Sequence, residues 1–187
     1  PASVTHPGDG SLVGTYSVPD AAAVESAIEA AWSVRKVAQA TTAAQRAAAL
    51  THVSRRLEER LDEVAALITA ENGKPITWAR AEAARAVSTF RWAAEEARRF
   101  NGEFQRLDTE ATTAGRAAII RRFPHGPVLG ISPFNFPVNL VAHKVAPALA
   151  VGAPIVIKPA PATPLGALLL GERLTDLPEL YRGPPAP

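Results

Sequence analysis

The sequence predicts an α/β fold: N-terminal helices, then a hairpin arm, then the first strand, helix, strand and helix of an incomplete parallel sheet. Apolar residues recur at helical spacing from residue 20 to about residue 100, and two β-branched segments then flank a Thr-rich turn. Short apolar runs alternate with helical stripes after residue 126. These changes of pattern divide the chain into a lead-in and helical part (1–102), an arm (103–125) and a truncated sheet unit (126–187).

Composition limits the function classes that fit this chain. Its 187 residues are 47% apolar and 20% charged, which is enough to bury a core. A net charge of +2 gives no nucleic-acid-binding footprint, so we expect no nucleic-acid partner. The chain has no cysteine, which excludes disulfides, thiolate metal sites and a cysteine nucleophile within these residues.

We expect no membrane segment and no secretory signal. The longest uncharged stretch, 123–143, is interrupted by four prolines and contains two polar asparagines. Residues 1–18 lack a basic end followed by an apolar run, so the expected location is cytoplasmic.

The first hundred residues predict a lead-in and three helical runs. Residues 1–18, rich in Gly, Ser, Thr and Pro, predict an extended lead-in. Asp20 is expected to cap a first helix, and Thr42 with Gln45 forms a capping box that opens a second run ending at residues 72–73, Asn-Gly. A third helix is predicted over 77–99. The stripes of these three runs are Val24, Ile28, Ala31 and Trp32; Leu50, Val53, Leu57 and Leu61; and Ala83, Val87, Phe90, Ala94 and Ala97.

The rest of the chain predicts strands. Segments 104–109 and 116–123 have the length and β-branched content of a hairpin. Apolar runs 128–131 and 155–157 predict parallel strands covered on both faces, each followed by a helix. The apolar stripes of these two helices are Val138, Val141, Val145, Ala148 and Leu149, and Leu165, Leu168 and Leu169. Residues 178–187 hold four prolines and are not expected to add a central strand, so the sheet is predicted to be unfinished.

Two polar side chains follow the predicted parallel strands. Residues 133–137, Pro-Phe-Asn-Phe-Pro, fix the backbone on both sides of Asn135. Ligands bind at the carboxyl ends of strands in open parallel sheets, so Asn135 stands where a neutral donor can meet an oxyanion. Its alternative role is to cap the helix or satisfy the turn. Lys158 follows the second strand, where an ammonium reaches ribose hydroxyls or phosphate, or simply faces solvent.

Standard phosphate and metal motifs are absent from the sequence. There is no Gly-x-Gly-x-x-Gly turn and no P-loop. The four histidines are scattered too widely for a local metal motif, so no metal site is predicted.

Five segments together resemble the NAD(P)-dependent aldehyde dehydrogenase superfamily, over about residues 18–178. They are 71–75 (Glu-Asn-Gly-Lys-Pro), 93–97, 126–137, 143–150 and 158–164. The resemblance implies an aldehyde dehydrogenase-like fold with a Rossmann-like sheet. It also implies oxidation of a small-molecule aldehyde to a carboxylic acid with NAD or NADP as cofactor.

The resemblance also assigns roles to individual positions. Asn135 matches the asparagine that donates its amide to the oxyanion, and Lys158 matches the lysine that binds the adenosine ribose and any 2′-phosphate. Pro161 stands where NAD-preferring relatives often carry a glutamate, so we expect NADP to be tolerated. The remaining cofactor-binding positions implied are Ile131, Ser132, Pro133, Phe134 and Ala160.

The catalytic cysteine and the water-activating glutamate of the family would lie beyond this chain. We therefore expect an N-terminal fragment that is inactive alone, with residues 103–123 forming the arm of a homodimer or homotetramer when full-length. The alternatives are a non-catalytic dinucleotide-binding or assembly module, and a helical interaction scaffold built from residues 21–100.

Overall fold

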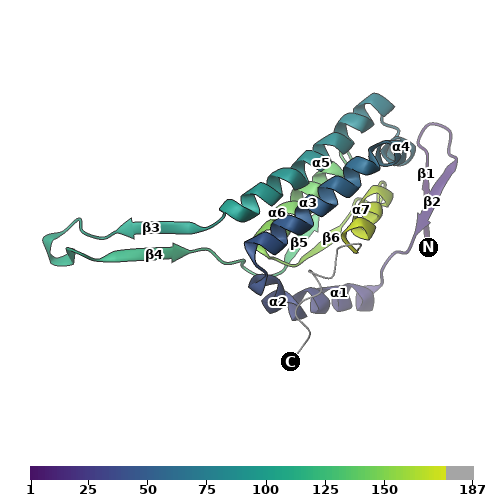
Figure 1. The fold of residues 1–187 in the computed structure, drawn as a ribbon. Helices are drawn as coiled ribbons and strands as arrows, with labels where there is room; N and C mark the ends of the chain where they lie inside the picture. The colour runs from purple at the N-terminus through teal and green to yellow at the C-terminus, as the bar shows by residue number, and fades with distance from the viewer. Residues whose placement is uncertain (176–187) are drawn as a thin grey trace.

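The computed structural model describes residues 1–175. It is an α/β arrangement with a long hairpin that projects from one end (Figure 1). The elements in chain order are β1 (Ala2–Thr5), β2 (Leu12–Tyr16), α1 (Ala21–Ser33), α2 (Arg35–Ala40), α3 (Ala43–Glu59), α4 (Leu61–Asn72), α5 (Ile76–Arg99), β3 (Gly102–Arg106), a 3-10 helix (Ala111–Thr113), β4 (Ala117–Arg121), β5 (Val128–Ile131), α6 (Asn139–Val151), β6 (Ile155–Lys158) and α7 (Leu165–Thr175).

The N-terminal residues form a hairpin. β1 and β2 pair antiparallel, with Ala2 opposite Tyr16, and Val4 is buried. The predicted lead-in is extended, but its pairing was missed because two strands of four and five residues carry little periodic signal. The Tyr16 hydroxyl donates to the Pro161 carbonyl at 3.3 Å, which ties this hairpin to the loop after β6.

The predicted helix starts are confirmed and some boundaries are corrected. Asp20 caps α1, and Thr42 and Gln45 form the capping box of α3. The second run is not continuous, because the chain leaves helical geometry at Arg60 and α4 starts afresh. α2 was not predicted. Of the α1 stripe only Ala31 is buried, so this helix turns most of its apolar side chains outward in the described chain.

One hydrophobic core joins the helices to the sheet. Leu50 of α3, Ile68 of α4 and Phe90 of α5 are fully buried, together with Val141 and Val145 of α6. α6 contacts both β5 and β6 on one side and α3 and α5 on the other. Burying large apolar side chains of this kind stabilises the fold by about 1.5–3 kcal/mol each.

The arm is a two-stranded antiparallel hairpin whose strands are shorter than predicted. Phe104 on β3 lies opposite Ile119 on β4. Figure 1 shows these two strands extending away from the helices. Gly102 starts β3 at φ 152°, and a Cβ there would lie 2.1 Å from the Ile120 carbonyl oxygen. Only glycine therefore fits at the base of the arm.

The parallel sheet is confirmed. β5 and β6 pair in register from Val128 opposite Ile155 to Ile131 opposite Lys158. The expectation that both faces are covered is wrong for the described chain. Leu129 and Ile131 are 65% and 60% exposed, because α6 packs on the opposite side of β5, where Gly130 lies against Ile157 and Lys144.

The predicted inward face of helix α7 is right in part, since Leu169 packs against the core and Leu165 is half-buried. Leu168 is 48% exposed, whereas Leu170 is 1% exposed and joins the core. Within residues 1–175, no helix combines the length and apolar character needed to cross a bilayer. The prediction for residues 178–187 lies outside the described residues.

Candidate functional site

The ends of β5 and β6 lie side by side. Ile131 is in register with Lys158, and the Ser132 amide continues the pairing by donating to the Lys158 carbonyl at 3.1 Å. The loop that carries Asn135 therefore leaves the sheet next to the loop that carries Pro161. This is the edge at which ligands bind in open parallel sheets.

The predicted site residues fall into an exposed set and a buried set. Ser132 and Ala160 are buried, and the exposed members are Ile131, Pro133, Phe134, Asn135, Lys158 and Pro161. The Asn135 side-chain amide forms no hydrogen bond within residues 1–175, and no side chain of the turn itself caps α6. This amide is thus available to an external acceptor.

Helix α6 is capped by a distant carboxylate instead. Glu82 of α5 is fully buried, and its Oε1 accepts from the backbone amides of Val138 and Asn139 at 3.0 and 3.2 Å. A negative charge at a helix N-terminus is favoured by the helix dipole. Glu82 therefore fixes the point at which the loop turns into α6.

The loop backbone is also held by side chains from the end of α4 and from its connection to α5. The Lys74 ammonium donates to the Asn135 carbonyl at 2.8 Å and pairs with Glu82. The same ammonium lies 4.1 Å from the centre of the Phe136 ring. The Asn72 amide donates to the Phe134 carbonyl at 2.9 Å. Two successive carbonyls of the loop are thus bonded to side chains.

Helix α7, which follows β6, has its own buried carboxylate cap. Glu71 accepts from the amides of Leu165 at 2.8 Å and Gly166 at 2.9 Å. Burial raises the pKa of Glu71 above its usual 4.5, against the lowering effect of the Gly166 and Leu165 amides, and the nearby Glu82 carboxylate raises it further. The tetrapeptide 71–74 therefore supports the loops after both strands.

Sequence reasoning missed Glu71, Asn72, Lys74 and Glu82 as individual residues. Residues 72–73 entered as a helix end and residues 71–75 as part of a resemblance, and no binding or positioning role was given to them. One available signal was the position of Glu82 beside Ala79, Ala83 and Ala86, on the buried face of α5. A carboxylate on an apolar stripe indicates a buried charge with a partner.

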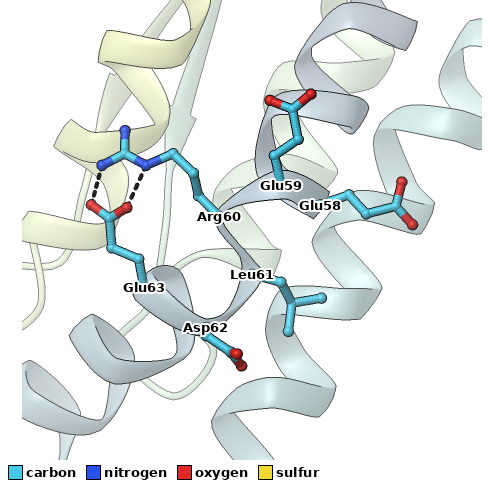
Figure 2. Close-up of a pocket in the computed structure, with 6 residues that line it drawn as sticks. All are labelled: Glu58, Glu59, Arg60, Leu61, Asp62 and Glu63. Carbon is cyan, nitrogen blue, oxygen red and sulfur yellow. Dashed lines mark hydrogen bonds and ion pairs between the residues drawn. The ribbon is translucent and has the colours of Figure 1, made fainter.

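Two of the surface hollows of residues 1–175 lie elsewhere. Figure 2 shows the first, of about 280 Å³, at the turn between α3 and α4, where Arg60 pairs with Glu63 among four carboxylates of residues 58–63. The second, of about 200 Å³, is lined by Trp32, Arg35 and residues that precede β5 and β6. Neither includes Asn135 or Lys158. Within residues 1–175, no cluster of three or more His, Cys, Asp or Glu side chains is placed to hold a metal ion.

Comparison with known proteins identifies the family. The model of the aldehyde dehydrogenase family matches residues 2–180. The chain belongs to this family. It is 37% identical over 168 residues to sulfoacetaldehyde dehydrogenase of Neptuniibacter caesariensis, and 37% identical over 169 residues to glutarate-semialdehyde dehydrogenase of Pseudomonas putida. These matches cover 90% of this chain but only 37% and 34% of the two relatives, so the chain spans about a third of their length.

Solved structures agree with the family assignment. Aldehyde dehydrogenase 21 of Physcomitrella patens, in complex with succinate, superimposes with a TM-score of 0.92 at 44% identity, covering 95% of this chain and 37% of that one. NADP-dependent glyceraldehyde-3-phosphate dehydrogenase of Bacillus halodurans, in complex with NADP, gives 0.89 at 35% identity, covering 94% and 37%. The aldehyde dehydrogenase-like fold predicted from the sequence is confirmed.

Proposed function

We propose that these residues form the N-terminal part of an NAD(P)-dependent aldehyde dehydrogenase that oxidises an aldehyde to a carboxylic acid. The observation that carries this proposal is the Asn135 amide, which is exposed at the end of a parallel strand and bonded to no group in the described chain. The loop beneath it is held by Lys74 and Asn72.

The residues at the strand ends fit a dinucleotide. The Lys158 ammonium is exposed at the end of β6 and suits a ribose or a 2′-phosphate. The buried Ser132 hydroxyl has no partner within residues 1–175, and an unpaired buried hydroxyl is stabilised when a ligand bonds to it. Ile131, Pro133 and Phe134 offer an exposed surface along the same edge. A bound NAD(P)⁺ supplies the hydride acceptor of the reaction.

NADP and NAD both suit the loop after β6. Pro161 follows the buried Ala160 and is exposed, and it places no carboxylate where a 2′-phosphate would lie. Because no negative charge at this position repels the phosphate, NADP is tolerated.

In the proposed reaction Asn135 stabilises the developing negative charge. As a nucleophile adds to the aldehyde, the carbonyl oxygen gains charge, and the Asn135 amide donates a hydrogen bond to it. A preorganised donor of this kind contributes about 2.7–4 kcal/mol of transition-state stabilisation. The chain holds no cysteine, so the nucleophile of this family's reaction has to come from residues outside it.

Homo-oligomer formation through the arm belongs to the same proposal. Phe104 and Ile119, which face each other across the hairpin, are 68% and 77% exposed. Paired apolar side chains on a projecting hairpin favour burial against another surface, here a second copy in a homodimer or homotetramer. The cytoplasmic location expected from residues 1–18 stays a prediction.

The test compares the complete protein with the 187-residue chain. Formation of NADH or NADPH is followed at 340 nm with succinate semialdehyde, glutarate semialdehyde or sulfoacetaldehyde, since relatives are named for such aldehydes. The complete protein is expected to turn over, and the 187-residue chain is not. Sustained turnover by the short chain would contradict the need for an outside nucleophile. Saturable NADP⁺ binding with no turnover by the complete protein would favour the non-catalytic module.

A further inference from the structure

The loop that carries Asn135 is held by side chains from a distant part of the chain. Its two consecutive carbonyls, those of Phe134 and Asn135, accept from Asn72 at 2.9 Å and from Lys74 at 2.8 Å. Asn72 is the last residue of α4 and Lys74 lies in the short connection to α5, some sixty residues earlier in the chain. Pro133 and Pro137 restrict the backbone at the two ends of this segment.

The Lys74 ammonium is itself fixed in place. Its side chain is 12% exposed, it pairs with the fully buried Glu82, and it lies against the face of the Phe136 ring. Glu82 at the same time caps α6 through the amides of Val138 and Asn139. The ammonium thus connects the Asn135 peptide to the start of the helix that follows it.

We propose that Lys74 is a positioning residue, which aims the Asn135 amide at the oxygen of the bound aldehyde by holding the Asn135 peptide group, with Asn72 as a second support. This inference rests on the proposed function, because Lys74 acts only through Asn135. Lys74 fixes the peptide group that contains the Asn135 carbonyl. The side-chain amide of Asn135 can then move only by rotation about its own two side-chain torsions. Catalysis is sensitive to such placement, since a displacement of about 1 Å costs about 100-fold in rate.

A double-mutant cycle in the complete protein tests this role. Lys74→Met is expected to lower kcat by about 10- to 100-fold, with the Kd for NADP⁺ changed less than about twofold, because Lys74 bonds to the Asn135 carbonyl and not to Lys158. In the Asn135→Ala background the same substitution is expected to change kcat by no more than about twofold, since the amide that it positions is gone. A purely structural role would lower kcat equally in both backgrounds.

Matched variants separate positioning from charge and from folding. Arg85 lies over the same Phe136 ring at 5.5 Å and is exposed, so Arg85→Met removes a nearby positive charge and leaves both carbonyl bonds in place. It is expected to keep kcat within about twofold. If Lys74→Met fails to fold because Glu82 is left unpaired, Lys74→Met/Glu82→Gln keeps an acceptor for the α6 amides and carries the cycle. Asn72→Ala is expected to give a smaller fall in kcat, about 2- to 10-fold.

The outcomes are distinguishable. An unchanged kcat in Asn135→Ala overturns the oxyanion role in the proposed function, and the positioning role with it. If Asn135→Ala lowers kcat but the Lys74 substitution has no effect, or has the same effect in both backgrounds, the positioning role alone is overturned.

Discussion

The two strand ends are built alike but held differently. Each parallel strand is followed by a helix whose first amides bond to a buried glutamate from outside the unit, Glu82 for α6 and Glu71 for α7. In the part of the chain that the structure describes, only the loop after β5 is also bonded to Lys74 and Asn72 at its carbonyls. Within residues 1–175, the loop after β6 has one comparable tie, from the Tyr16 hydroxyl to Pro161 at 3.3 Å.

This difference matches the two proposed tasks. A group that stabilises a transition state has to be fixed in advance, because any reorganisation during the reaction costs rate. A long ammonium side chain that binds ribose or phosphate reaches its ligand by choosing among rotamers. Asn135 therefore needs a rigid loop, whereas Lys158 needs only an open position at the end of its strand.

The largest expected effect is on the free energy of unfolding, when the buried glutamate that caps α6 is replaced. Glu82→Ala leaves the Lys74 ammonium without its buried partner and two α6 amides without an acceptor. We expect the free energy of unfolding to fall by about 3–5 kcal/mol in urea denaturation. Glu95→Ala, which removes an exposed pair with Arg98, is the control and should cost about 1 kcal/mol or less. An equal loss in both variants would contradict the structural role of Glu82.

Lys158→Ala tests the end of β6, which is proposed to bind the cofactor. The side chain is exposed and lies outside the core, so the free energy of unfolding should change by less than about 0.5 kcal/mol. The Kd for NADP⁺ of the complete protein should rise by about 10-fold or more, since a hydrogen bond to a charged group contributes about 1.5–3 kcal/mol. Calorimetry that finds unchanged affinity would remove Lys158 from the cofactor site.

The smallest expected effect is a change of stability with pH at Glu71. Burial raises the pKa of this carboxyl in the folded chain, so the folded state binds its proton more tightly than the unfolded state. The stability from this linkage is complete below the usual pKa of 4.5 and is lost as pH rises through the raised value. The stability of the natural protein relative to Glu71→Gln should therefore fall as pH rises over this range. A constant difference in denaturation across that range would contradict the raised pKa.

Features with local causes could be predicted from the sequence. The Asp20 cap and the Thr42–Gln45 capping box depend on residues three positions apart, and both occur. The strands β5 and β6 follow from short apolar runs, and their parallel pairing follows from the helix between them. The same pattern predicted that Asn135 and Lys158 follow the strands, and their roles in binding and catalysis stay predictions.

Features with distant causes could not be predicted. The carboxylates that cap α6 and α7 lie 56 and 94 residues before the amides that they accept from. No local sequence pattern connects these carboxylates to the helices that they cap. Only folding brings Lys74 into contact with the Asn135 loop. The error at Leu168 has a similar origin, because the inward face of α7 is set by its contacts with the helices beneath it, where Leu170 is buried.

The most direct test of the central claim is Asn135→Asp in the complete protein. Aspartate has nearly the same size, and when ionised it accepts hydrogen bonds but cannot donate one to an oxyanion. We expect kcat for aldehyde oxidation to fall by about 100- to 1,000-fold or more, with the Kd for NADP⁺ little changed. A variant that oxidises aldehyde at the natural rate would contradict the claim that this amide stabilises the transition state.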